Sequence, residues 1–374
     1  MLTYRQLEDA GEAVVRIIQE TEQALINDMA RRISLLGEVT DGTNWQALRL
    51  ELNSAEQKKI LAELAKQLNM SEKRVVELFD EAATRAIELD NRMYRAAGYK
   101  PIPLEQNPQM QQIIRSGLQK TLQEYQNLTL TTANTATRQF EQALDLAYQK
   151  MASGGFTYQQ AIKSGIQELT RNGIASILYP TGHVDYMDVA FRRAVLTGVN
   201  QTCAEIQLEN MNQMGTDLVE TTAHAGARPD HMPWQGRVFS VGGKSKKYPD
   251  FVSSTGYGEG WGLCGWNCRH SFFPFFEDLS DSAYTSDKLR EYNSKTVTID
   301  GEKMDLYDAT QQQRYIERQI RKWKREESAL DAAGLDSGRA GMKIREWQAA
   351  QRDFVAQTGL TRDYFRERGG AQLG

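Results

Sequence analysis

The helical spacing of apolar residues over the N-terminal half is the feature that most constrains what this chain can fold into. From residue 3 to residue 38, apolar residues recur at intervals of three, four or seven, which is the period of an α-helix. They are Leu7, Val14, Ile17, Ile18, Leu25, Met29, Ile33 and Leu36. No proline precedes Pro101. The pattern predicts one long helix or two nearly collinear helices.

The helical pattern continues beyond this stretch, and short polar segments predict where its helices begin and end. Ser54 followed by Gln57 is a capping-box pattern, and Asn69–Ser71 predicts a break before the next helix. Two prolines within residues 98–103 force extended backbone and end that helix. The pattern then resumes, so we expect an N-terminal helical region at residues 1–152.

A glycine-rich break follows this region, and the pattern beyond it is again helical. Thr157 with Gln160 forms a second capping-box pattern. Tyr179–Gly182 predicts the end of that helix, and a further helix extends to about residue 213. We find no strand signal here, and therefore expect residues 153–215 to be a helical connector.

The character of the sequence changes at Gly215, where alternating residues begin to predict strands. Asp300-Gly301 is the strongest short hairpin turn signal in the chain. The three predicted strands are 217–222, 237–241 and 296–299. We expect a small α+β module at 216–330 and a C-terminal helix with a tail at 331–374. The predicted fold class is mainly α: a long N-terminal helical region, then a small α+β module, then C-terminal helices.

Composition excludes several classes of protein. The net charge of −4 gives no global basic field for nucleic acid, so any DNA contact must come from a local patch. No run of about 18 apolar residues is present, so we expect no membrane span. The N-terminal residues do not form a secretory signal pattern. Three cysteines argue against a disulfide scaffold, and we expect the chain to be made in a reducing cytoplasm. We expect Cys203 to be a small buried residue.

Most of the residues that could carry chemistry gather between Thr221 and Phe276. This window holds three of the four histidines and two of the three cysteines. The candidate metal ligands are His224, His231, Cys264, Cys268 and His270. Two loop segments carrying such nitrogen and sulfur ligands suit a tetrahedral zinc site, although the cysteine spacing is not the standard pair. The alternative is that they are loop residues held by hydrogen bonds, with the cysteines packed as small hydrophobes.

The same residues also allow a catalytic interpretation. A Cys/His pair could act as nucleophile and base, and His224 with Asp230 could act as base and orienting group. The sequence contains no nucleophile elbow, metalloprotease helix, P-loop or dinucleotide loop. A metal- or Cys-dependent hydrolase, such as a maturation protease, is therefore the rival hypothesis.

A basic stripe on the predicted helix after residue 309 offers a contact surface for DNA phosphates or an acidic partner. Its residues are Arg314, Arg318, Arg321, Lys322, Lys324 and Arg325. Interspersed glutamates dilute the stripe, so a solvated helix face is the alternative. A DNA-binding protein ejected with a genome is the third hypothesis.

Two long motifs of unusual composition carry a resemblance to a known family. They are AHAGARPDHMPWQGRVFSV at 223–241 and GYGEGWGLCGWNCRHSFFPFF at 256–276. DVAFRRAVLTGVNQT at 188–202 and LYDATQQQRYIERQIRKWKRE at 306–326 extend the likeness. In these segments the chain resembles the phage minor capsid protein 2 family, which is related to MuF-type head morphogenesis proteins.

The resemblance implies a virion structural protein rather than an enzyme, with no cofactor unless the zinc interpretation holds. It implies a component of the phage head interior near the portal, made in the cytoplasm of the bacterial host. Such a protein would act in head morphogenesis and in DNA packaging or ejection. The implied partners are the portal protein and the major capsid protein, with weak contact to packaged genomic DNA and none to a membrane. The residues matching the family pattern, which would hold the module together, are His224, Arg228, Asp230, His231, Trp234, Gln235, Gly236, Cys264, Asn267, Cys268, Arg269 and His270.

Overall fold

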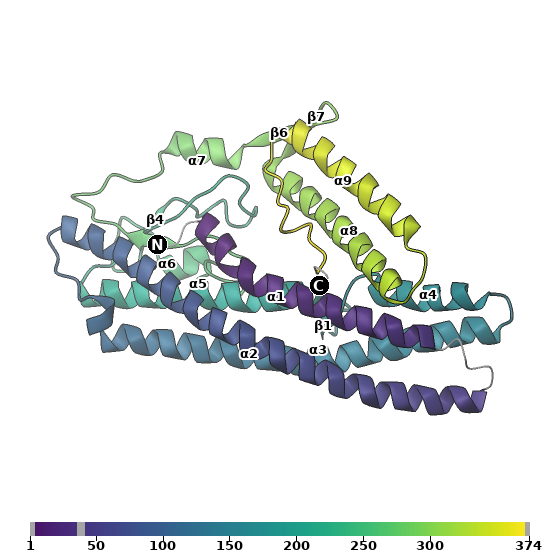
Figure 1. The fold of residues 1–374 in the computed structure, drawn as a ribbon. Helices are drawn as coiled ribbons and strands as arrows, with labels where there is room; N and C mark the ends of the chain where they lie inside the picture. Colours follow the sequence, from purple (N-terminus) through teal and green to yellow (C-terminus); the bar gives the residue numbers. More distant parts are fainter. Residues whose placement is uncertain (1–3, 36–41, 371–374) are drawn as a thin grey trace. The chain divides into compact units, whose positions relative to one another are not determined.

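A computed structural model of the chain describes residues 4–35 and 42–370, and helices dominate it (Figure 1). The helices are α1 Tyr4–Ser34, α2 Gly42–Ala96, α3 Pro108–Ala152, α4 Tyr158–Thr170, α5 Met187–Gln213, α6 Phe251–Thr255, α7 Ser286–Asn293, α8 Leu306–Ala332 and α9 Gly338–Thr358, with a 3-10 turn at Leu104–Gln106. Within the described residues the strands form three small antiparallel sheets. They are β1 Ala175–Leu178 with β2 Val184–Tyr186, then β4 Val238–Ser240, β3 Leu218–Thr221 and β5 Phe272–Pro274 in that order, and β6 Thr296–Ile299 with β7 Glu302–Asp305. The predicted mainly α fold class is confirmed.

The contacts divide the chain into two compact units, and each unit takes three separate segments. Unit 1 comprises Met1–Glu12, Glu72–Glu124 and Arg192–Gln311. Unit 2 comprises Ala13–Ser71, Tyr125–Phe191 and Gln312–Gly374. Five helices, α1, α2, α3, α5 and α8, contribute residues to both units. The four-part division expected from the sequence stays a prediction.

Three predictions about secondary structure are wrong. The helix start expected at Ser54 and the break expected at Asn69–Ser71 are both absent, because α2 runs without interruption from Gly42 to Ala96. Asparagine and serine inside a helix each cost only a few tenths of a kcal/mol to about 0.7 kcal/mol, which the packing of a long helix offsets. The connector is also not all helical, because Tyr179–Gly182 is the turn of the β1–β2 hairpin rather than a helix end.

Several local predictions are confirmed. Thr157 caps α4 with a complete capping box, in which its side chain accepts from Gln160 N and the Gln160 side chain accepts in return. Asp300 and Gly301 turn the β6–β7 hairpin with φ of 51° and 83°. This pair of positive values is typical of the turn that suits the twist of two paired strands.

In unit 1, α2, α3 and α5 pack through apolar side chains. The buried residues are Ala83 and Ile87 of α2, Met110 and Ile114 of α3, and Ile206 of α5. Small residues bring α3 and α5 close together in a reciprocal contact. Gly117 of α3 faces Thr202 of α5, and Gly198 of α5 faces Thr121 of α3. A Cβ added at either glycine would lie 2.0 Å from the threonine Oγ1, so an alanine at either position would force that side chain to move.

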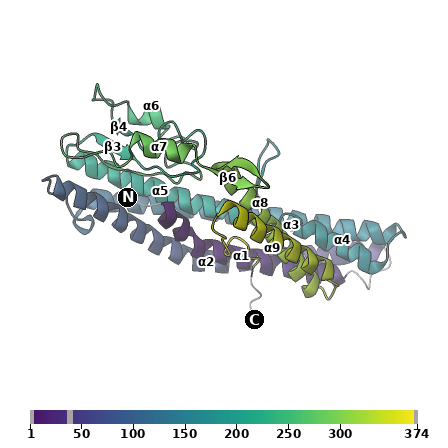
Figure 2. The ribbon, with the colours of Figure 1, turned by 90° about the horizontal axis from the view of Figure 1, so that it is seen from above.

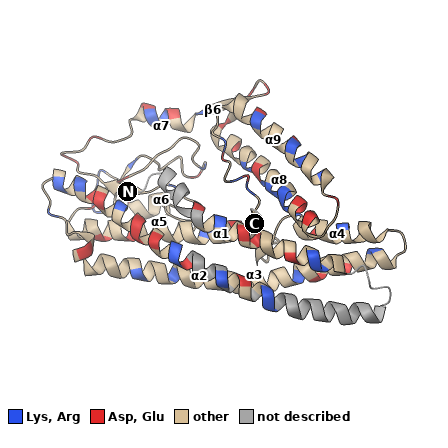
Figure 3. Cartoon of the chain, viewed as in Figure 1, with Lys and Arg blue, Asp and Glu red and all other residues tan. Residues whose placement is uncertain are grey.

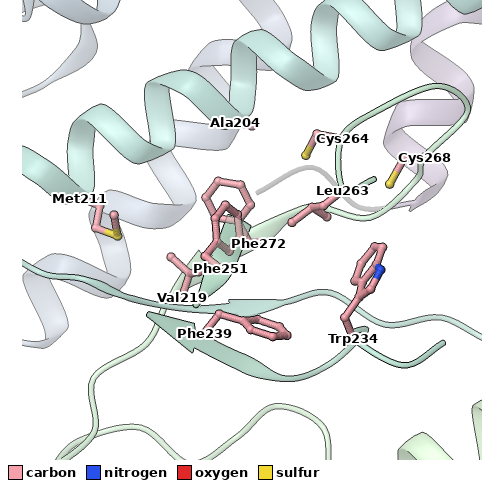
Figure 4. Close-up of a cluster of buried hydrophobic side chains, with 10 residues drawn as sticks. All are labelled: Ala204, Met211, Val219, Trp234, Phe239, Phe251, Leu263, Cys264, Cys268 and Phe272. Carbon is pink, nitrogen blue, oxygen red and sulfur yellow. The ribbon is translucent and has the colours of Figure 1, made fainter. Parts of the chain in front are cut away.

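The three-stranded sheet of unit 1 carries a core of its own (Figure 4). β3 is central, and Val219 pairs with Phe239 of β4 and Pro274 of β5. Figure 4 shows Phe251 and Phe272 between these strands and α5. Each such aromatic ring stabilises the fold by roughly 1.5–3 kcal/mol through burial. The cluster is Ala204, Met211, Val219, Trp234, Phe239, Phe251, Leu263, Cys264, Cys268 and Phe272. The two loops with the candidate residues are therefore anchored to this core.

In unit 2, α8 and α9 lie side by side in both ribbon views (Figure 1, Figure 2). Tyr315 of α8 and Trp347 of α9 make an edge contact with ring centroids 5.8 Å apart. The segment after α9 returns along α8, because the Gln313 side chain donates to Thr361 O at 2.8 Å and Arg321 donates to Arg366 O at 2.6 Å. Gln313 and Arg321 of α8 therefore bind the backbone of the segment that follows α9.

Candidate functional site

The first candidate loop follows β3 and is folded by its own backbone hydrogen bonds. His231 N donates to Arg228 O at 2.8 Å, and Gln235 N donates to His231 O at 3.1 Å. The buried Thr221 side chain donates to Trp234 O at 2.8 Å and so fixes the end of the loop to β3. His231 is thereby held at a fixed place over the sheet, with its side chain buried.

The second candidate loop, residues 256–271, is a series of tight turns before β5. The chain crosses itself closely at Gly262, where an added Cβ would lie 1.9 Å from Gly256 O. Cys264 and Asn267 both adopt positive φ, at 60° and 55°. Only a chain with small residues here can turn this sharply, which explains the glycine content of the motif. The turns direct Cys264, Cys268 and His270 into the interior.

Three side chains from the two loops meet in one cluster. Nδ1 of His231 lies 3.3 Å from Nδ1 of His270, and Sγ of Cys268 lies 3.8 Å from the same His270 nitrogen. The ligand atoms of all three residues fall within 4.8 Å of one another. Among the residues that the structure describes, this is the one group of three or more His, Cys, Asp or Glu side chains whose ligand atoms lie close enough together to hold a metal ion.

The far ring nitrogens of the two histidines contact oxygen acceptors. His270 Nε2 lies 3.0 Å from Gln235 Oε1, and His231 Nε2 lies 3.1 Å from Trp261 O. The Arg228 guanidinium also approaches, with its Nη2 2.7 Å from His231 Nε2 and in hydrogen-bond contact with Trp261 O. These partners fix the orientation of both rings.

Side chains of α5 hold the second loop through hydrogen bonds to its backbone. The buried Asn200 side chain donates to Cys268 O and to His270 O, each at 3.3 Å. Gln207 donates to Phe272 O at 2.9 Å and to the buried Asp90 of α2 at 2.8 Å. The loop is therefore positioned by side chains of the rigid helix and not by the loop alone.

Burial keeps the thiols and imidazoles of the cluster neutral near pH 7. Burial raises the pKa of Cys268 to about 11, although the backbone N–H of His270 acts in the opposite direction. Burial likewise raises the pKa of Cys264 well above its ordinary value. Burial lowers the pKa of His231, and it lowers the pKa of His270 well below the ordinary range, assisted by neighbouring positive charge. A protonated, buried thiol is a poor nucleophile.

The structure brings together three of the five candidate ligands and places the other two beside them. His224 stacks on His270, with ring centroids 4.5 Å apart and an interplanar angle of 23°. Cys264 lies in the same loop, and its Sγ contacts His270 O at 3.7 Å. Both residues therefore support the cluster of His231, Cys268 and His270 without belonging to it.

The other motif residues act as supports. Asp230 accepts from Arg228 Nε at 2.6 Å, and Trp234 packs against His231 with ring centroids 4.6 Å apart. Gly236 turns the first loop with a φ of 64°, and Arg269 donates to Asn267 O at 3.4 Å. That the motif holds the module together stays a prediction.

Sequence reasoning missed three supporting groups: Asn200, the Trp261 carbonyl and Asn293. Asn293 accepts from Gln235 Nε2 at 2.6 Å and so orients the carboxamide that faces His270. Asn200 lies in α5, within the segment 188–202 that extends the family likeness, but no role was predicted for it. Its polar side chain on a buried helix face was a signal, but only the fold shows what it contacts.

The basic stripe lies on α8, where basic and acidic residues are interspersed (Figure 3). Arg325 is buried and pairs with Glu22 of α1 at 3.1 Å, so it is not available to a DNA phosphate. Arg321 pairs with Asp188 at 3.3 Å. The remaining candidates are partly buried or exposed: Arg314, Arg318, Lys322 and Lys324. Contact of these four with DNA or with a partner stays a prediction.

Comparison with known proteins gives the class to which these features belong. Over 253 residues the chain is 28% identical to a protein named "Structural protein" of Lactococcus phage LL-H, and the match covers 65% of each chain. Over 125 residues it is 33% identical to a "Structural protein" of Lactococcus phage mv4, covering 33% of this chain and 92% of that one. The class is thus that of bacteriophage structural proteins. The chain spans just under two thirds of the length of the LL-H relative.

A sequence model of the family described as phage minor capsid protein 2 matches residues 2–356. The chain belongs to the phage minor capsid protein 2 family, which confirms the resemblance carried by its two motifs. No solved structure matches it. Across the described residues, each helix is either too short or too polar to span a lipid bilayer.

Proposed function

We propose that this chain is a non-enzymatic structural component of the phage head, placed in the head interior near the portal. In this role it contributes to head morphogenesis and to DNA packaging or ejection. Its partners are the portal protein and the major capsid protein, and its contact with packaged DNA is weak. Membership of the minor capsid protein 2 family supports a structural role.

The observation that carries the proposal is the use of the reactive side chains inside the fold. His231 and Cys268 both contact His270, and all three side chains are buried. The pKa of the Cys268 thiol, raised to about 11 by burial, gives it little thiolate with which to attack a substrate. A cluster of this kind supports the geometry of two loops rather than turnover.

Purified particles of the phage that encodes this chain test the proposal. Cross-linking followed by mass spectrometry should join the chain to the portal protein and to the major capsid protein. The chain should resist added protease in full heads and become sensitive once the genome has left. Cross-links confined to tail proteins, or full sensitivity in intact heads, would contradict a position inside the head.

The same particles distinguish the rival functions. A maturation protease would leave its substrates uncut in particles that carry Cys268→Ala, whereas a structural role leaves the cleavage pattern unchanged. A DNA-binding protein would be retained on duplex DNA at low salt and released steeply as salt rises. A structural protein should stay with portal or capsid protein under the same salt increase.

A further inference from the structure

The two buried Nδ1 atoms of His231 and His270 face each other at 3.3 Å. Both atoms carry lone pairs in the acceptor form, so two unprotonated nitrogens would repel each other at this distance. Either one nitrogen carries a proton, or a cation lies between them. Arg228 donates to His231 Nε2, so without a metal ion the proton lies on His231 Nδ1. A cation in place of this proton would also meet the Cys268 thiol, whose Sγ lies 3.8 Å from His270 Nδ1.

Two of the three separations in the cluster are close to those of one cation geometry, and the third, between His231 and Cys268, is within 4.8 Å. A tetrahedral zinc ion, with Zn–N of about 2.0–2.1 Å and Zn–S of about 2.3 Å, sets two nitrogen ligands about 3.3 Å apart. It sets a nitrogen and a sulfur ligand about 3.6 Å apart. The corresponding separations here are 3.3 Å between the histidines and 3.8 Å between His270 and Cys268. Imidazole with thiolate is also the ligand combination that zinc prefers.

The surroundings of the cluster supply an independent argument. A histidine that binds metal through Nδ1 carries its proton on Nε2, and that N–H normally donates to an oxygen acceptor. Both Nε2 atoms have such an acceptor: Gln235 Oε1 at 3.0 Å for His270 and Trp261 O at 3.1 Å for His231. At His231 the metal-free arrangement differs, because Arg228 Nη2 lies 2.7 Å from Nε2 and can only donate, which leaves the proton on Nδ1. Zinc binding therefore needs this proton to move to Nε2 and Arg228 to donate to Trp261 O alone, a carbonyl that it already contacts.

The thiol also has a partner suited to its charged form. The backbone N–H of His270 donates to Cys268 Sγ at 3.4 Å. Such a bond stabilises a thiolate, which is the form that binds metal. Binding forms two Zn–N bonds and one Zn–S bond, displaces water from the hydrated ion and releases the thiol proton to solvent.

We propose that His231, Cys268 and His270 bind one structural zinc ion, which links the two loops on the sheet of unit 1. Cys264 lies outside this set of ligands. The site joins residue 231, which precedes β4, to residues 268 and 270, which precede β5. The zinc site does not depend on where the protein lies in the particle. The zinc proposal and the proposed position in the head can therefore fail independently.

The test uses the full chain, purified with zinc present, stripped with a chelator and titrated with Co²⁺. We expect one zinc per chain before stripping and, after Co²⁺ addition, the visible spectrum of tetrahedral cobalt with a sulfur charge-transfer band. Zinc should displace the cobalt and raise the melting temperature. A zinc-free preparation, or a spectrum of octahedral aqueous cobalt, would overturn the proposal without any variant.

Matched variants then identify the ligands. Cys268→Ala should lose the charge-transfer band, and Cys264→Ala, in the same buried loop, should keep it. Loss of the band in both variants would contradict the ligand set. Gln235→Leu removes the acceptor for His270 Nε2 and should weaken Co²⁺ binding by about 10- to 100-fold. An unchanged affinity in that variant would contradict the ring orientation that the site requires.

Discussion

Replacing Gly117 with alanine should destabilise this protein, although alanine is the better helix former. The added Cβ would lie 2.0 Å from Thr202 Oγ1 and 3.0 Å from Thr202 Cγ2. Overpacking of this kind costs about 1–3 kcal/mol, and the gain in helix propensity is about 1 kcal/mol. The net loss in the free energy of unfolding should therefore be about 0–2 kcal/mol.

The decisive measurement combines this change with Thr202→Ala. That substitution removes both Oγ1 and Cγ2, so most of the clash disappears and the propensity gain remains. In the Thr202→Ala background, Gly117→Ala should then stabilise by up to about 1 kcal/mol. The sign of the effect changes between the two backgrounds, and the difference is the interaction energy of the pair.

Urea unfolding of the four proteins, followed by far-UV circular dichroism, measures this interaction energy. The reciprocal pair, Gly198→Ala with Thr121→Ala, should behave in the same way because its Cβ–Oγ1 separation is also 2.0 Å. Ser116→Ala, on the exposed side of α3, is the control and should gain a few tenths of a kcal/mol in both backgrounds. If Gly117→Ala has the same effect with and without Thr202, the close contact of α3 and α5 is refuted.

Two further predictions concern buried charges of unit 2. Burial raises the pKa of Glu317 from 4.5 to about 7 in the folded protein. The neutral side chain therefore stabilises the fold fully below pH 4.5, and this stabilisation is lost as the pH rises to about 7. Glu317→Gln should therefore gain stability over the wild type between about pH 5 and pH 8, on the order of 3 kcal/mol, and a pH-independent difference in urea unfolding would contradict this. Arg325→Met leaves the buried Glu22 carboxylate unpaired and should cost about 3–5 kcal/mol. Adding Glu22→Gln keeps an acceptor for Ile174 N, 2.8 Å away, and should recover part of that loss in the same assay.

The parts of the fold that the sequence predicted are those with local causes. The Thr157 cap depends on residues within one helical turn, and the Asp300-Gly301 turn depends on two residues that accept positive φ. The strands at 217–222 and 237–241 were predicted by alternation alone, and each is confirmed within one or two residues of its ends.

The β1–β2 hairpin could not be predicted in this way. Its strands have four and three residues, and a register irregularity between Ala175 and Ile177 disturbs the alternation. Its stability comes from tertiary contacts, such as the hydrogen bond of 2.6 Å between the Thr132 and Ser176 side chains. Neither residue has a distinctive sequence context, so only the packed structure shows the pairing.

The sequence predicted which region holds the candidate site, but not how its side chains are arranged. Clustering in the sequence gave five metal-ligand candidates, and the turns of the second loop determine which of them converge. Cys264 and Cys268 are equivalent by residue type and spacing, yet only Cys268 reaches the His231–His270 pair. The positive φ values of Cys264 and Asn267 shape the turns between the two cysteines, and the Asn200 side chain of α5 holds Cys268 O.

The interleaving of the two compact units has a consequence for how the protein is made. The chain alternates between unit 1 and unit 2 along its length, and the last segment of unit 2 begins only at Gln312. A ribosome therefore synthesises all of unit 1 before unit 2 has its final helices, and neither unit is contiguous enough to fold as an early domain. Contacts between residues so far apart in sequence close slowly, so the nascent chain must keep exposed apolar helix faces from aggregating until synthesis is nearly complete.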